Sequence, residues 1–164
     1  FVALQVEYSL LQRTPERELI PMAKHFGLTV TPWAPLAGGA LTGKYLKGDK
    51  GRLPETSKRL NDNSTRIVKE VVAIAEELNV NASHVALKWT MQKEYSSLPI
   101  VGATKLLQLQ DNLKAVDVTL TADHINRLDE ASKIELGFPH DFFAEAGVRQ
   151  VTYGGFYERI EKRK

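Results

Sequence analysis

Strand-like and helix-like segments alternate along this chain. Residues 2–7, 28–31 and 98–101 are short, continuous apolar runs, and the longer segments between them repeat apolar residues at helical spacing. Strands of this kind, separated by helices, pair in parallel and are covered by helices. A barrel of eight strand-helix units needs about 250 residues, so the 164 residues of this chain correspond to a small open sheet or to part of a barrel.

The first residues favour part of a barrel. Phe1 and Val2 already have high β-propensity, and no methionine, turn or polar segment precedes them. We therefore expect the sequence to begin inside a strand, with residues 1–137 forming the barrel portion.

The last segment, residues 138–164, has a different composition. It is rich in aromatic side chains and ends in a short basic run over residues 159–164. We expect this tail to pack on the barrel as an aromatic cover, and partial disorder is the alternative.

The helices are predicted from their periodicity and their start signals. Thr14 followed by Pro15 is typical of a first helical turn that is capped by a hydroxyl, and Thr121 marks a second such start. Residues 32–51 are rich in Gly, Pro and Lys, which predicts a long loop. The expected helices cover residues 14–27, 64–78, 106–113 and 122–132, with one more helix capped by Asn81 or Ser83.

Composition limits the possible partners and compartments. The net charge is +2, with 22 basic and 20 acidic residues in mixed order, which gives little electrostatic support for nucleic-acid binding. No apolar run reaches the roughly 20 residues of a membrane-spanning helix, and no leader opens the chain. The absence of cysteine fits a reducing compartment. We expect a soluble, cytoplasmic protein.

The segments that follow the strands are the expected place for a ligand, because parallel strand-helix folds bind ligands at the carboxyl ends of their strands. Residues 33–44 combine an aromatic side chain, several glycines and a lysine, which suit a dinucleotide. Residues 102–105 precede a helix whose free N–H groups would bind a phosphate. Glycine-rich loops before helices also occur without a phosphate, so spacing alone leaves both readings open.

Three groups of motifs resemble the aldo-keto reductase superfamily. QVEYSL at residues 5–10 is similar to its sixth barrel strand, and WAPL at 33–36 with GKY at 43–45 is similar to its seventh strand and the loop after it. PIVGAT at residues 99–104 is similar to its eighth strand. The resemblance implies a partial parallel (β/α)₈ TIM barrel, made of strands six to eight with their helices and the tail. It also implies reduction of a carbonyl substrate by hydride from NADPH.

The resemblance implies roles for individual residues in binding NADPH or NADP⁺. Gln5 would hydrogen-bond the nicotinamide carboxamide, and Trp33 would stack on the nicotinamide ring. The middle of the cofactor would be bound by backbone groups and two cations. The residues implied there are Ala34, Pro35, Leu36, Ala37 and Gly38 along the pyrophosphate, Lys44 on a phosphate and Arg59 over the cofactor.

The adenosine end would be bound by the turn after the last strand and by the helix that follows. Gln108 stands where many members have an arginine for the 2′-phosphate, and Ala34 stands where the family has a serine. The preference between NADPH and NADH is therefore open, although Thr104 and Lys105 favour a bound phosphate. The residues implied are Gly102, Thr104 and Lys105 for the 2′-phosphate and Gln108, Asp111 and Asn112 for the adenine.

No catalytic residue and no metal site are expected on this chain. The family's catalytic Asp, Tyr, Lys and His lie on its first four strands, none of which is present here, so we expect the chain alone to be inactive. His25 and His124 fall on helix positions predicted to face solvent, and His84 lies near a helix start.

A binding module is the alternative to an enzyme. Potassium-channel β-subunits resemble this chain and combine the same cofactor site with a partner. A half-barrel could bind a nucleotide or a partner without a reaction, and its open edge would favour association because the first strand lacks a neighbour.

Overall fold

The computed structural model describes residues 1–161, and its contacts divide the chain into two units, Phe1–Lys133 and Ile134–Lys164. The predicted basic end of the tail lies in part outside the described residues, because residues 162–164 are not among them.

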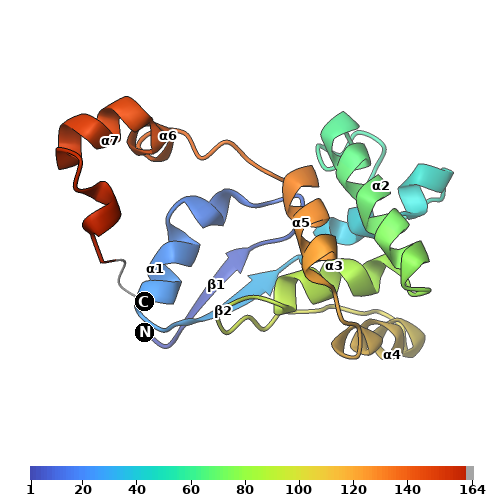
Figure 1. Ribbon diagram of the computed structural model, residues 1–164. Coiled ribbons are helices and arrows are strands. Elements are labelled where there is room, and N and C mark those ends of the chain that lie inside the picture. The colour runs from blue at the N-terminus through green and yellow to red at the C-terminus, as the bar shows by residue number, and fades with distance from the viewer. Residues whose placement is uncertain (162–164) are drawn as a thin grey trace. The chain divides into compact units, whose positions relative to one another are not determined.

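The first unit is built on a parallel sheet of two strands, β1 (Ala3–Glu7) and β2 (Thr29–Trp33) (Figure 1). Gln5 lies opposite Thr31 and Glu7 lies opposite Trp33. Because side chains alternate across a strand, these four point to one face of the sheet. Val30, on the other face, is buried in a small cluster with α1 (Leu19–His25), the helix that connects the two strands. The α/β class and the parallel pairing are thus as expected.

The predicted third strand forms only in part. The backbone of residues 96–100 runs parallel beside β2, with Leu98 N donating to Val30 O (2.9 Å) and Ile100 N donating to Pro32 O (2.7 Å). Only Val30 and Ser97 form a bridge. Pro32 has no N–H with which to donate to this neighbour, so the ladder cannot continue. The prediction of a strand over residues 98–101 is therefore wrong, although the segment lies where that strand was expected.

The helix predicted over residues 14–27 is divided. A 3₁₀ turn, Thr14–Arg17, precedes α1, and Glu18 between them has φ −141° and ψ −48°, which is not helical. The Thr14 hydroxyl donates to the Gln12 side chain (2.7 Å) and caps nothing. The turn and the helix together still cover most of the predicted range.

The predicted loop after β2 contains two 3₁₀ turns, Ala37–Thr42 and Lys44–Lys47. Next come α2 (Asp62–Glu77) and α3 (Ala82–Met91), which confirm the two expected helices. Helix α2 begins two residues earlier than predicted because Asn61 caps it and forms a capping box with Ser64.

The last helices of this unit agree closely with the sequence. Helix α4 (Leu106–Leu113) has the predicted bounds, and a 3₁₀ turn, Lys114–Val116, follows it. Helix α5 (Ala122–Ala131) begins after Thr121, whose hydroxyl accepts a hydrogen bond from the His124 N–H.

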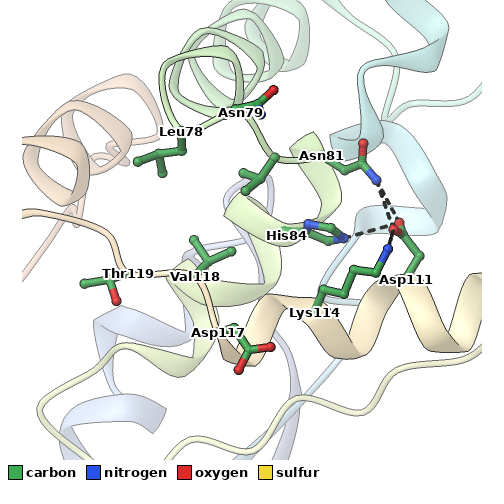
Figure 2. Close-up of a pocket in the computed structure, with 10 residues that line it drawn as sticks. Leu78, Asn79, Asn81, His84, Asp111, Lys114, Asp117, Val118 and Thr119 are labelled. Atoms are coloured by element: carbon green, nitrogen blue, oxygen red, sulfur yellow. Dashed lines mark hydrogen bonds and ion pairs between the residues drawn. The ribbon is translucent and has the colours of Figure 1, made fainter.

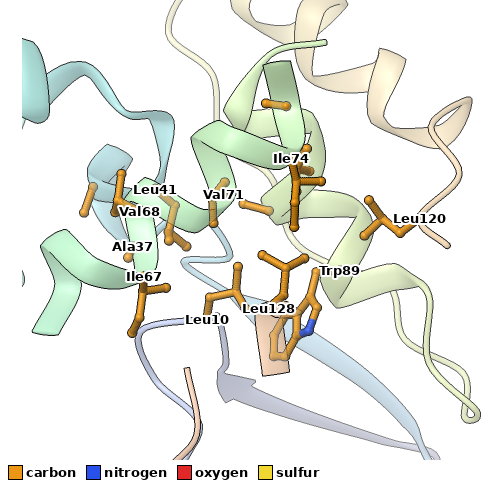
Figure 3. Packing of buried hydrophobic residues seen from close by; sticks show 14 of the residues in the cluster. Leu10, Ala37, Leu41, Ile67, Val68, Val71, Ile74, Trp89, Leu120 and Leu128 are labelled. Atoms are coloured by element: carbon orange, nitrogen blue, oxygen red, sulfur yellow. The ribbon is translucent and has the colours of Figure 1, made fainter. Parts of the chain in front are cut away.

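Helices α2, α3 and α5 and the loop after β2 enclose the main core. Figure 3 shows Val71 and Ile74 of α2 gathered near Trp89 of α3 and Leu128 of α5. Trp89 is 0% exposed, and its ring centroid lies 5.2 Å from that of Tyr8, just beyond β1. The core therefore fixes the end of β1 against α3, and with it the start of the loops that follow the strands.

The second unit contains two short helices, α6 (His140–Ala144) and α7 (Ala146–Tyr153), and a 3₁₀ turn, Tyr157–Arg159. The ring centroids of Tyr153 and Tyr157 are 5.2 Å apart, and the Arg149 guanidinium lies 4.6 Å from the Tyr157 ring. Over residues 1–161, no helix combines the length and the apolar character that crossing a membrane requires.

Candidate functional site

Three segments of the chain reach the same edge of the sheet. Glu7 ends β1 opposite Trp33, which ends β2, and the hydrogen bond from Ile100 to Pro32 places residues 96–100 on the other side of β2. Because all three run in parallel, the loops that follow them leave from one edge. The structure thus brings the segments after residues 7, 33 and 101 to a common side of the molecule.

The two residues predicted to bind a nicotinamide line one pocket. This pocket has a volume of about 650 Å³ and includes Gln5 and Glu7 of β1, Trp33 of β2, and Gln12 and Thr14 from the segment after β1. Trp33 is 40% exposed, so part of its indole is open to a ligand. An amide and an accessible aromatic ring in one pocket can bind a flat ring that carries a carboxamide.

The backbone after Trp33 adopts an unusual conformation over the predicted pyrophosphate segment. Ala34 and Ala37 both have φ +51°, and Gly38 and Gly39 have φ +70° and +93°. For alanine the left-handed region costs about 1 kcal/mol. Leu36, at φ −98° and ψ 8°, precedes Ala37. The N–H groups of Ala37 and Gly39 donate to the carbonyl oxygens of Ala34 and Leu36 (2.8 Å each), so the left-handed residues fold the segment into tight turns. Strained backbone of this kind is a marker of functional segments.

Arg59, which the sequence resemblance places over the cofactor, lies beside this segment in the structure. A Cβ atom on Gly38 would lie 3.2 Å from Nη1 of Arg59 and 2.8 Å from Cδ2 of Leu53. Nη2 of Arg59 also donates to Oε1 of Glu7 (2.5 Å). Sequence reasoning missed Glu7 as a partner, and its only signal was an acidic side chain at the end of an apolar strand.

Lys44 lies beside two glycines of the same loop. A Cβ atom on Gly39 would lie 3.3 Å from Nζ of Lys44, and one on Gly51 would lie 2.6 Å from it. The Tyr45 hydroxyl accepts a hydrogen bond from the Leu53 N–H (2.9 Å), which folds residues 45–53 back on the loop. A basic side chain is therefore held next to the left-handed backbone.

The second predicted segment is a turn that leads into α4. Oε1 of Gln108 accepts hydrogen bonds from the N–H and the hydroxyl of Thr104 (3.2 and 3.1 Å). Lys105 is the N-cap residue of α4, and its side chain makes no capping hydrogen bond. Gly102, Thr104, Lys105 and Gln108 are all exposed, so the start of this helix and its hydroxyl and ammonium groups are accessible to an anion.

Asp111, another predicted adenine contact, makes its polar contacts with the start of α3. Its carboxylate accepts hydrogen bonds from Nδ2 of Asn81 (3.1 and 3.0 Å) and lies 3.3 Å from Nε2 of His84 (Figure 2). Asn112, next to it on α4, is half-buried. The structure therefore pairs Asp111 with the start of α3, while Gln108, one turn earlier on α4, pairs with Thr104.

One prediction about the histidines is wrong. His124 is 8% exposed and does not face solvent. Its Nδ1 accepts a hydrogen bond from the Thr121 N–H, and its Nε2 lies 3.4 Å from Glu77 of α2. The third position of α5 faces α2, and the imidazole takes the place that Glu or Gln has in a usual capping box. Over residues 1–161, no three His, Asp or Glu side chains gather as metal ligands do.

The chain matches one protein-family profile and several known proteins. The profile described as Aldo/keto reductase family matches residues 1–133. A protein of Bacillus subtilis named an uncharacterized oxidoreductase is 35% identical over 129 residues, which cover 79% of this chain and 40% of that protein. An aryl-alcohol dehydrogenase of Pestalotiopsis microspora is 30% identical over 171 aligned residues, covering 100% of this chain and 44% of that protein.

A third relative, from Oryza sativa, is named a "probable voltage-gated potassium channel subunit beta". It is 36% identical over 140 residues, covering 76% of this chain and 42% of that protein. The chain thus spans less than half the length of these relatives. Because the profile matches residues 1–133 of the 164, this chain belongs to the aldo/keto reductase family.

Proposed function

We propose that this chain is the cofactor-binding part of an NADP(H)-dependent aldo-keto reductase, built as strands six to eight of a (β/α)₈ barrel. The observation that carries the proposal is the common edge at which Trp33, the left-handed backbone after it and the turn at Thr104 begin. The absence of cysteine supports a cytoplasmic location.

The residues present fit a phosphorylated dinucleotide. Arg59 and Lys44, which lie beside the left-handed turns from Ala37 to Gly39, suit the negative charge of a pyrophosphate. Gln5 and Trp33 share a pocket that suits a nicotinamide. The exposed start of α4 with Thr104 and Lys105 suits the 2′-phosphate.

The role of these residues in the reaction is to bind and to orient. NADPH, when bound, supplies the hydride that reduces an aldehyde or ketone. Trp33 would cover one face of the nicotinamide, so that the other face alone meets the substrate, and Gln5 would fix the rotation of the ring through its carboxamide. The proton donor would come from the Asp, Tyr, Lys and His of the remaining barrel strands, and this chain alone would be inactive.

One relative supports a substrate class. An aryl-alcohol dehydrogenase is among them, so we propose an aromatic aldehyde as the carbonyl substrate. The test is NADPH consumption with a panel of aromatic aldehydes by the protein that carries both barrel parts. Gln5→Leu is expected to raise the KM for NADPH, and no consumption with any aldehyde would contradict the enzyme proposal.

A partner-binding module is the second candidate, since a potassium-channel β-subunit is also a relative. Leu98, Leu106 and Leu107 are exposed, and such an apolar surface suits association. The coding sequence upstream of Phe1 distinguishes the two candidates. Asp, Tyr, Lys and His in the family's context would support the enzyme, whereas a start codon directly before Phe1 would support the module.

Gly38→Ala is expected to weaken NADPH binding severalfold. Gly38 has φ +70°, and an added Cβ would meet Leu53 at 2.8 Å and Arg59 at 3.2 Å, which would displace a cation proposed to bind the pyrophosphate. Gly27→Ala is the matched control, because Gly27 has φ +65° and no atom within 4 Å of the added Cβ. Cofactor titration of both variants checks this. Equal affinities for the two variants would show that the close approach at Gly38 does not shape the site.

A further inference from the structure

Helix α4 carries three of the predicted adenosine contacts and yet has no buried residue. Leu106, Leu107 and Leu113, which would normally anchor such a helix, are all exposed. Within residues 1–161, apolar packing therefore does little to fix α4. Polar contacts must supply much of its placement, and with it the placement of the turn at Thr104.

The main polar contact is made by Asp111 with the start of α3. Nδ2 of Asn81 donates to both carboxylate oxygens (3.1 and 3.0 Å), and Nε2 of His84 lies 3.3 Å from Oδ2. Lys114, one turn later, places Nζ 3.4 Å from Oδ1. Figure 2 shows these side chains converging on the Asp111 carboxylate from two helices.

Asn81 gives up another role to make this contact. It is the N-cap residue of α3, a position where Asn side chains normally accept a hydrogen bond from the helix, but its side chain makes no capping hydrogen bond. The backbone of Asn81, at φ −78° and ψ 146°, has the ordinary conformation of an N-cap residue, but its amide donates to Asp111 of α4 instead. The structure thus uses Asn81 to join two helices and leaves the start of α3 without a side-chain cap.

His84 contacts Asp111 from a buried position. Its side chain is 5% exposed, and Nε2 has no well-aligned hydrogen-bond partner among the described residues. It lines a pocket of about 600 Å³ together with Asn81, Asp111 and Lys114. Burial raises the pKa of Asp111. The Asn81 hydrogen bond and the nearby His84 and Lys114 together lower this pKa by more, so that it ends below its ordinary value. The carboxylate is therefore kept charged and facing α3.

We propose that Asn81 and His84 are positioning residues for the adenosine end of the cofactor, which hold Asp111 and so fix α4 and the turn that binds the 2′-phosphate. The inference rests on the proposed cofactor site. Gln108, which orders Thr104, and Asp111 lie on the same helix. Loss of the contacts between Asp111 and α3 would therefore move the groups at Thr104 that would donate to the 2′-phosphate.

The test separates the two ends of the cofactor. Adenosine 2′,5′-bisphosphate probes the turn at Thr104, and nicotinamide mononucleotide probes the pocket of Gln5 and Trp33. Asn81→Ala is expected to weaken bisphosphate binding about tenfold, the size of one lost hydrogen bond to a charged group. His84→Ala removes an imidazole 3.3 Å from Asp111 that makes no well-aligned hydrogen bond, so its expected loss is smaller. Both variants should bind the mononucleotide as the unchanged chain does. His84→Gln, which keeps an N–H donor, should restore most of the lost affinity.

The controls are Asn63→Ala and His25→Ala, since both residues are exposed and lie on other helices. Unchanged bisphosphate binding in Asn81→Ala and His84→Ala, or equal loss for both probes, would overturn the proposal. If the unchanged chain binds neither probe, the proposed function fails instead. Amide exchange then decides on the anchor: Asn81→Ala must speed exchange in α4 and leave α5 unchanged, and equal exchange in α4 would refute it.

Discussion

Replacing Arg13 with methionine is expected to lower the free energy of unfolding by about 3 kcal/mol, as when one partner of a buried ion pair is removed. The Arg13 side chain is 12% exposed. It donates to both carboxylate oxygens of Glu16 (2.8 and 2.9 Å) and to Asp129 O (2.9 Å). It also donates to Oγ of Ser132 (2.8 Å). The guanidinium thus joins the turn after β1 to the end of α5, and methionine would leave the buried acceptors unsatisfied.

Urea unfolding of the chain measures this loss. Arg66→Met is the matched control, because Arg66 is exposed and its guanidinium donates to the neighbouring Asn63 on the same helix. The control should change the free energy of unfolding by less than about 0.5 kcal/mol. Equal stabilities for the two variants would mean that Arg13 does not hold α5 in place.

Replacing Lys93 with methionine is expected to have the opposite effect and to stabilise the chain by about 2 kcal/mol at neutral pH. Nζ of Lys93 lies 3.3 Å from the centroid of the Trp89 ring. Burial lowers the pKa of this ammonium to about 8, against the charges of Asp129 and Glu16, which raise it. Each pKa unit corresponds to about 1.4 kcal/mol, and the contact with Trp89 offsets part of the penalty.

The stabilisation by methionine is expected to depend on pH, because Lys93 loses its proton at a lower pH in the folded chain than in the unfolded chain. The pKa of Lys93 is about 8 in the folded chain against the ordinary 10.5, so between these values the unfolded chain binds more protons and wild-type stability rises with pH. The penalty is complete below pH 8, and the advantage of methionine should therefore shrink as the pH rises toward 10.5.

Unfolding of Lys93→Met and of the unchanged chain at neutral pH and near pH 10.5 measures this change. Lys24→Met is the control, because Lys24 is exposed and its ammonium pairs with the exposed Glu94. A gain that is the same at both pH values would show that the charge of Lys93 is not the cause. A loss of stability at neutral pH would show that its contact with Trp89 outweighs burial.

Local sequence signals predicted the helices well because their causes are local. Thr121 caps α5 through its own hydroxyl, and the apolar spacing of α4 lies within eight residues. The third strand was overpredicted, because its pairing depends on Pro32, a residue of a different segment that has no N–H to donate. His124 was misplaced for a similar reason, since the face of α5 that meets α2 is set by tertiary packing.

For the candidate site, too, local motifs were predictable from the sequence and long-range contacts were not. Motifs placed Gln5, Trp33 and Thr104, each at the end of a strand-like run, and the structure puts those ends on one edge. The partners that orient the site were not predictable. Glu7 meets Arg59 and Asn81 meets Asp111 across 52 and 30 residues of sequence, and no periodicity or motif relates such positions.

Titration of the chain with NADPH, followed by tryptophan fluorescence, tests the central claim most directly. Trp33 is 40% exposed in the candidate pocket and Trp89 is 0% exposed in the core, so a stacked nicotinamide should quench Trp33 alone. We expect saturable quenching in the unchanged chain and none in Trp33→Phe, which keeps an aromatic ring. Unchanged fluorescence at high NADPH concentration, or equal quenching in Trp33→Phe, would contradict a cofactor site at this edge.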